Sequence, residues 1–138
     1  LGINAKMSEV HAAMGMAVLP YVRETIEARK RISQRYDQAF AALPVQRPTI
    51  PASTEYNFAY YPVEVKNAEE CARKMALGQV FARRYFFPSL NDLPYVTHTS
   101  APISEELAGR MLCLPLHPGM TDEEIARVID AFAEAVHR

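Results

Sequence analysis

The sequence lacks the features that would point to nucleic acid, to a membrane or to secretion. Its net charge of −1 at pH 7 leaves no basic surplus, and nucleic-acid binding needs a basic patch or stripe. No apolar run approaches the roughly 20 residues that cross a bilayer. The N-terminus also lacks the basic and apolar regions of a signal peptide. We therefore expect a cytoplasmic protein without nucleic-acid or membrane partners.

Metal-binding and disulfide patterns are also missing. Cys71 and Cys113 lie far apart and outside any metal-ligand spacing, so buried thiols in a reducing compartment are favoured over a disulfide. The four histidines form neither an HxxxH nor an HExxH pair, which predicts that no metal is bound. One of them, His117, fits a pocket and an ordinary loop equally well.

The common nucleotide and hydrolase motifs are absent too. The chain contains no GxGxxG, GxxxxGK[ST] or GxSxG sequence, which removes the usual dinucleotide, P-loop and hydrolase interpretations. What is present is a chain of 138 residues, 49% of them hydrophobic, which is enough for one domain with a core. Composition and spacing thus predict a small α+β domain with a candidate ligand loop.

The N-terminal third predicts two helices. The first spans residues 7–18 with Ser8 as its cap, and its small residues Ala12, Ala13 and Gly15 favour the close approach of another backbone. The second begins at Pro20 and runs to about residue 42. Its charged face is typical of a solvated surface, and the alternative is a face packed against a further domain or a second subunit.

The rest of the chain predicts three strands alternating with helices. The expected strands are 57–65, 80–87 and 111–114; the expected helices are 68–77 between Asn67 and Gly78, a short helix opened by Ser104, and a terminal helix with a capping box at Thr121. The fold class is therefore α+β: long N-terminal helices followed by a small three-stranded, mainly antiparallel sheet with helices on one face. We expect residues 1–43 to form interdomain or dimer helices and residues 44–138 to form the small domain.

One predicted strand carries an unusual run of residues. Arg83, Arg84 and Tyr85 lie beside two phenylalanines, and a strand with arginine next to aromatic rings can bind an anionic or sugar ligand. An ordinary strand with solvated arginines explains the same run equally well.

Four segments, in the same order and spacing, resemble the DegT/StrS-type sugar aminotransferases, which are fold-type I enzymes that use pyridoxal phosphate (PLP). Residues 2–15 resemble the family's G-x-N-x-[RK]-M-S-E-x-x-A-A-x-G segment, and residues 29–36 its R-x-x-x-A-x-x-Y helix. Residues 83–94 resemble R-x-Y-F-x-P-L-H-x-x-P, and residues 112–125 resemble L-x-L-P-x-x-x-x-M-T-x-E-E-I. The resemblance covers essentially the whole chain.

The resemblance implies that this chain is the C-terminal portion of a longer enzyme. The large PLP-binding domain, with the aspartate that pairs the pyridine nitrogen and the Schiff-base lysine, would lie upstream, so we nominate no catalytic residue in this chain. The family's opening asparagine, here Asn4, would reach the phosphate of the PLP in the neighbouring subunit. A side-chain amide can donate to a phosphate oxygen, and the active site would then require a homodimer.

Two departures from the family pattern concern the substrate. Lys6 stands where arginine is common, which resembles a subgroup acting on dTDP-linked 4-keto-6-deoxy sugars, and it would be a monodentate phosphate ligand. Asn91 stands at the histidine of the P-L-H stretch; it can bind a sugar hydroxyl but cannot act as an acid or base. The candidate substrate-binding residues are Lys6, Arg84, Tyr85 and Asn91.

The function that the resemblance implies is transfer of an amino group from an amino acid, usually glutamate, to a nucleotide-linked keto sugar in nucleotide-sugar biosynthesis. One alternative is a sugar 3-dehydratase on the same fold, in which histidine replaces the Schiff-base lysine. Another is a non-catalytic binding or regulatory module. In each case we expect the isolated 138-residue chain to lack transaminase activity.

Overall fold

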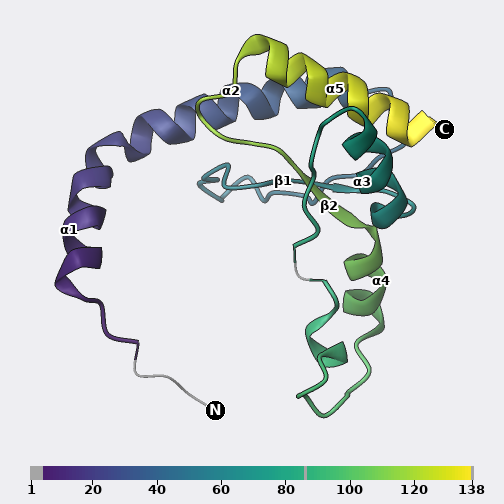
Figure 1. Cartoon of the computed structure of the whole chain (residues 1–138), viewed down its shortest axis with the longest axis horizontal. Coiled ribbons are helices and arrows are strands. Elements are labelled where there is room, and N and C mark those ends of the chain that lie inside the picture. Colours follow the sequence, from purple (N-terminus) through teal and green to yellow (C-terminus); the bar gives the residue numbers. More distant parts are fainter. Residues whose placement is uncertain (1–4, 86, 138) are drawn as a thin grey trace.

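The computed structural model describes residues 5–85 and 87–137 as an α+β fold (Figure 1). A two-stranded sheet lies at the centre, helices α2, α3 and α5 pack near it, and α1 and α4 extend away from it. No helix among these residues is long and apolar enough to cross a membrane. In chain order the elements are α1 (Glu9–Val18), a 3-10 turn (Leu19–Tyr21), α2 (Val22–Phe40), β1 (Tyr61–Glu64), α3 (Ala68–Leu77), a second 3-10 turn (Leu90–Asp92), α4 (Pro102–Arg110), β2 (Met111–Leu114) and α5 (Asp122–His137).

The N-terminal helix α1 and the start of α2 form an arm that curves away from the body (Figure 1). The Ser8 hydroxyl accepts a hydrogen bond from the His11 backbone N–H, as expected of an N-cap. However, α1 buries none of its residues, and Met14 and Met16 are 61% and 76% exposed. A Cβ added at Gly15 would meet no atom within 4 Å apart from its own neighbouring helix backbone, so the close approach of another backbone expected at the small residues of this helix does not occur among the described residues.

The core forms where the sheet meets α2, α3 and α5. The two strands pair antiparallel, with Tyr61 opposite Leu114 and Val63 opposite Leu112. Because side chains alternate along a strand, these four face the helices and are buried. Four aromatic rings join the strands to the helices: Tyr36, Phe40, Tyr61 and Phe132 make mutual contacts with ring centroids 4.8–6.2 Å apart.

The third strand expected over residues 80–87 is wrong. Among the described residues of this segment, only Arg83 pairs with the sheet, through two backbone hydrogen bonds of 2.8 and 2.9 Å to Cys113. The Val80 N–H is taken by the Met75 carbonyl at the end of α3, and Arg84 turns to Glu69 on the same helix. The residue pattern of this segment is that of a strand, but the segment makes its contacts with α3 and not with a neighbouring strand. The sheet therefore has two strands among the described residues.

The helix caps were predicted more accurately. The Asn67 side chain accepts from the Glu70 N–H, and α3 ends at Gly78. At the start of α5, the Glu124 carboxylate accepts from the Thr121 N–H at 2.8 Å and the Thr121 hydroxyl accepts from the Glu124 N–H at 3.2 Å, which confirms the capping box. The start of α4 was placed too late: it begins at Pro102, because proline is tolerated at the first helical position.

Candidate functional site

Two clefts meet beside the segment around Arg83. The first, here called the apolar cleft, has a volume of about 740 Å³ and lies between α4 and the face of the strands that carries Pro62, Met111 and Cys113. Tyrosine rings and the apolar side of α4 form most of its wall: Tyr56, Tyr60, Tyr85, Ile103 and Leu107. Such a wall suits the apolar or planar parts of a small molecule.

The second, here called the charged cleft, has a volume of about 510 Å³ and shares Tyr60, Tyr85 and Cys113 with the apolar cleft. Arg29 of α2, Arg83 and His117 line it together with Phe81 and the residues that follow β2. None of the described residues in its wall is acidic. The two clefts therefore join an apolar surface to a cationic one across the same tyrosines.

The two neighbouring arginines of the 83–87 segment point to different surroundings. Arg83 lines the charged cleft beside Tyr85, in keeping with the alternation of an extended backbone. The Arg84 guanidinium instead lies 3.4 Å from the centroid of the Phe87 ring and 3.5 Å from a Glu69 carboxylate oxygen. Of the candidates predicted from sequence, Tyr85 thus lines both clefts, whereas Arg84 lines neither.

Asn91, a candidate sugar ligand, lies within a hydrogen-bond network at the start of α4. Its amide nitrogen donates to Glu105 at 2.6 Å, and its amide oxygen accepts from Ser89 at 2.5 Å. The same Glu105 oxygen accepts from the Ala101 backbone N–H at 2.8 Å. The hydrogen bond from Ala101, followed by that from Asn91, lowers the pKa of Glu105. The second hydrogen of the Asn91 amide is what remains to meet a ligand.

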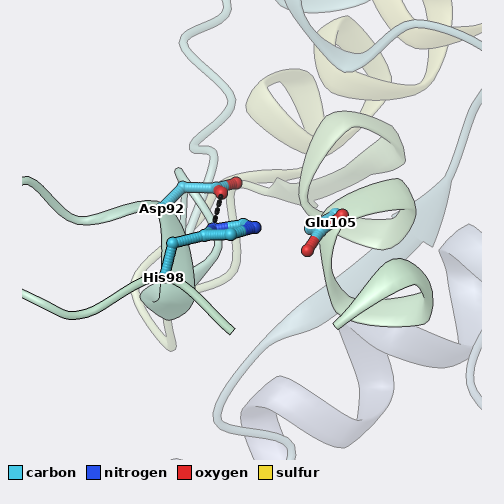
Figure 2. Close-up of side chains that lie close together, drawn as sticks. All are labelled: Asp92, His98 and Glu105. Carbon is cyan, nitrogen blue, oxygen red and sulfur yellow. Dashed lines mark ion pairs between the residues drawn. The ribbon is translucent and has the colours of Figure 1, made fainter. Parts of the chain in front are cut away.

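Figure 2 shows Asp92 and His98 side by side on the loop, with Glu105 facing them from α4. Their potential metal-binding atoms lie within 4.8 Å of one another, an arrangement that the search for histidine pairs in the sequence did not anticipate. The polar atoms already have internal partners: the His98 Nδ1 lies 3.4 Å from Asp92 Oδ1 and 3.2 Å from the Asn91 carbonyl oxygen. We interpret this cluster as a brace that ties the loop to α4.

The remaining sequence-predicted residues lie at the N-terminus. Asn4 falls outside the described residues. Lys6 is exposed just before α1, a helix that buries none of its residues. The structure therefore does not bring Lys6 together with Tyr85 or Asn91 within one chain.

Both cysteines are free thiols, as the sequence predicted. Burial raises the pKa of Cys71 to about 11 and also raises that of Cys113. Cys113 lines both clefts, and its raised pKa keeps it protonated and weakly nucleophilic there at neutral pH.

Sequence reasoning did not single out Arg29 or Tyr60, which the fold brings into the clefts. Arg29 was grouped with the other charges of its helix, although the positions three and four residues away on either side (Thr25, Ile26, Ile32 and Ser33) carry no acidic side chain. That local absence of a partner was the available signal. Tyr60 carried no comparable signal, because only the fold sets its ring against Tyr85, with centroids 4.8 Å apart.

Comparison with known proteins identifies relatives along the whole chain. Residues 1–133 match the model of the DegT/DnrJ/EryC1/StrS aminotransferase family. The chain is 26% identical to dTDP-4-amino-4,6-dideoxy-D-glucose transaminase of Escherichia coli, a match that covers 92% of this chain and 38% of that protein. The chain thus spans about two fifths of the length of the curated relatives it matches.

Solved structures agree in fold. A crystal structure of DesI in the presence of its TDP-sugar product superimposes with a TM-score of 0.87 at 32% identity, covering 99% of this chain and 38% of that one. A family member from Brucella abortus superimposes with a TM-score of 0.85 at 26% identity, covering 100% of this chain and 38% of that one. The chain belongs to the DegT/DnrJ/EryC1/StrS aminotransferase family.

Proposed function

We propose that this chain is the C-terminal portion of a PLP-dependent aminotransferase that moves an amino group from glutamate to a nucleotide-linked 4-keto-6-deoxy sugar. The observation that carries the proposal is the family match over residues 1–133, together with the four sequence motifs. The named relatives support the substrate class, since they include a dTDP-sugar transaminase and a GDP-perosamine synthase. The same relatives support a role in nucleotide-sugar biosynthesis.

The N-terminal arm would serve the cofactor of a partner subunit. It carries Asn4 and Lys6, an amide donor and an ammonium two residues apart that suit a phosphate group. Its exposed apolar side chains, among them Val10, Met14 and Val18, form a surface that is typical of an interface. The homodimer that we propose would cover this surface and bring Asn4 to the phosphate of the partner's PLP.

PLP, when bound, supplies the electron sink for amino transfer. The residues of this chain would bind and orient the substrate: Tyr85 from the wall of both clefts, and Asn91 through its remaining amide hydrogen to a sugar hydroxyl. Arg84 would act indirectly, since its contacts with Glu69 and Phe87 fix the segment that leads into the Asn91 loop.

The test uses the full-length protein that contains this segment. We expect bound PLP to give visible absorption, and glutamate with a dTDP-4-keto-6-deoxy sugar to yield 2-oxoglutarate and the amino sugar. Visible absorption with loss of the 3-hydroxyl and no amino transfer would instead indicate the 3-dehydratase. No cofactor binding would favour the non-catalytic module. The isolated 138-residue chain is the control, and transaminase activity in it would contradict the proposed division of the site.

Subunit sharing is tested by complementation. Asn4→Ala and a variant of the upstream lysine are each expected to have low activity. Mixed dimers should recover activity, because one of their two sites takes its lysine from the first variant and its asparagine from the second. Mixtures no more active than the two parents would contradict the role proposed for Asn4.

A further inference from the structure

The side chains that tie the loop to α4 also have the composition of a metal site. Asp92 and His98 come from the loop and Glu105 from α4, and one potential ligand atom of each lies within 4.8 Å of the other two. Figure 2 shows the imidazole ring of His98 beside Asp92, with its tip directed toward Glu105. Exposed carboxylates are common on this chain, but among the described residues this is the one group of three such side chains that converges so closely.

The two carboxylates of this group have no permanently charged partner. Within the described residues, no lysine or arginine forms an ion pair with Asp92 or Glu105, and Asp92 is paired only with the imidazole of His98. An uncharged imidazole offers a single N–H donor and leaves both negative charges in place. A divalent cation held by all three side chains would neutralise both carboxylates.

Asn91 supports two of the three side chains through hydrogen bonds. Its carbonyl oxygen lies 3.2 Å from His98 Nδ1, and because a carbonyl oxygen only accepts, this contact places the proton on Nδ1 and leaves Nε2 as the free nitrogen of a neutral ring. Its amide nitrogen donates to Glu105 Oε1 at 2.6 Å, and the Ala101 N–H donates to the same oxygen. Glu105 Oε2 makes no hydrogen bond within the described chain. Such outer hydrogen bonds are typical of the histidine and carboxylate ligands of metals, whose other atoms they leave available.

The ligand types point to Zn²⁺. An imidazole nitrogen together with carboxylate oxygens suits this ion, whereas Mg²⁺ and Ca²⁺ favour oxygen ligands alone. Zn²⁺ binds these atoms at about 2.0–2.2 Å, which sets two ligands of a tetrahedral ion about 3.3–3.6 Å apart. The widest separation here has to shorten by about 1.5 Å at most. The side chains of His98 and Asp92 are 61% and 41% exposed, so they are free to rotate that far, and water completes the fourth position.

We propose that Asp92, His98 and Glu105 bind one Zn²⁺ ion, which fastens the loop to the start of α4. This assignment goes beyond the proposed aminotransferase function and does not depend on it. The competing interpretation is a brace that is held by the hydrogen bonds and the ion pair without any cation.

The experiment titrates Zn²⁺ into the full-length protein that contains this segment, by calorimetry in competition with a chelator of known affinity. Each variant is compared with the wild type, so that Zn²⁺ bound elsewhere in the protein cancels. Because His98 is exposed, His98→Ala should fold normally, and we expect it to bind one Zn²⁺ fewer per chain. Asp92→Asn and Glu105→Gln should weaken binding at this site about 10- to 100-fold or more. Glu105→Gln keeps an oxygen that can accept from the Ala101 N–H.

Two matched controls lie outside the cluster. His137→Ala removes an exposed histidine at the end of α5, and Glu106→Gln removes the exposed carboxylate next to Glu105. Both variants should bind Zn²⁺ as the wild type does. Co²⁺ provides a second probe, because its visible absorption becomes strong when it is four-coordinate. This absorption should appear in the wild type and in both controls, and it should be lost in His98→Ala.

Limited proteolysis tests whether the ion holds the loop. Tyr95 is 79% exposed and lies between the two loop ligands in the sequence, so chymotrypsin should cleave after it. Zn²⁺ should slow this cleavage in the wild type but not in His98→Ala, and EDTA should restore the original rate. A brace without a cation would give the same rate with and without Zn²⁺.

Three results would overturn the assignment. One is equal Zn²⁺ binding by the wild type and His98→Ala. Another is a loss in His98→Ala while Asp92→Asn and Glu105→Gln bind normally, which would indicate a single exposed imidazole. The third is an equal loss in the two controls, which would indicate unspecific binding. Failure of the proposed function has a different signature, since a wild type without PLP absorption or amino transfer would still report on Zn²⁺ in each of these assays.

Discussion

Tyr36 connects α2 to the segment after β2, and that segment lines the charged cleft. The Tyr36 hydroxyl makes it possible to test how much one buried hydrogen bond stabilises this connection. The side chain is 0% exposed, and its hydroxyl donates to the Pro115 carbonyl at 2.9 Å. Burial raises the pKa of Tyr36 well above its usual value, so the hydroxyl remains a donor up to strongly alkaline pH. Tyr36→Phe keeps the ring and its aromatic contacts while removing only this donor.

We expect Tyr36→Phe to lower the free energy of unfolding by about 1–2 kcal/mol. The lost hydrogen bond contributes about 1 kcal/mol, and the Pro115 carbonyl left without its donor adds to the loss because it is only partly exposed. Urea unfolding of the 138-residue chain, followed by far-UV circular dichroism, measures the change. A cooperative transition with an unchanged slope would show that stability alone has changed.

Tyr56→Phe is the matched control. Its hydroxyl donates to the Tyr60 carbonyl at 3.0 Å at an exposed site, where water can replace it, so its loss should cost less than about 0.5 kcal/mol. Equal losses in the two variants would show that burial does not set the value of the Tyr36 hydrogen bond. A Tyr36→Phe protein as stable as the wild type would refute the reasoning outright.

Three further predictions concern the termini of helices and a buried thiol. Thr121→Ala should cost about 1 kcal/mol by removing the cap of α5, measured by the same unfolding assay, whereas Thr97→Ala on the exposed loop should be neutral. Burial raises the pKa of Cys71 from 9.0 to about 11, so Cys71 should react with a thiol reagent at pH 8 about 100-fold more slowly than an exposed cysteine. The protonated thiol also stabilises the fold. That stabilisation is present below pH 9 and is lost as the pH rises from 9 to 11. The pKa of Glu105 is lowered in the folded chain. Its carboxylate therefore stabilises the start of α4 at pH values above its unfolded pKa of about 4.5. This stabilisation is lost as the pH falls through the lower pKa of the folded state. The protection of the Ala101 amide against hydrogen exchange, taken relative to the intrinsic exchange rate at each pH, should therefore fall in acid. Glu105→Gln should remove that change, and a protection factor that stays constant as the pH falls in the wild type would contradict the prediction.

Local signals predicted the helices and their caps well. Asn67, Gly78 and the Thr121 capping box act within a few residues of themselves, so their effect can be read from neighbouring positions alone. The 80–87 segment was predicted to be a strand because arginine and aromatic residues alternate in it. The same alternation suits an extended segment that makes its contacts with α3 instead of with a strand. Likewise, Pro102 rather than Ser104 opens α4, because proline is tolerated at the first helical position, and the Glu105 carboxylate accepts a hydrogen bond from the Ala101 N–H just before the helix.

The candidate site was only partly accessible from sequence. Tyr85 was identified because it sits in an unusual motif. Arg84 was chosen as the candidate, whereas the structure places Arg83 in a cleft wall, since the choice between the two depends on which face of the extended segment turns to α3. The hydrogen bond between Asn91 and Glu105 joins residues 14 positions apart, a separation at which spacing in the sequence carries no information about contact.

The sequence by itself determined the family, the caps of α1, α3 and α5 and the absence of recognised metal and nucleotide motifs, because each depends on residue type and short-range spacing. The tertiary structure alone decided that the sheet has two strands among the described residues, that Arg29 and Arg83 share a cleft, and that α1 leaves its apolar side chains uncovered. These outcomes depend on which distant segments compete for the same partner. The outcome of this competition depends on the packing of the whole folded chain, so it cannot be predicted from the sequence of any single segment.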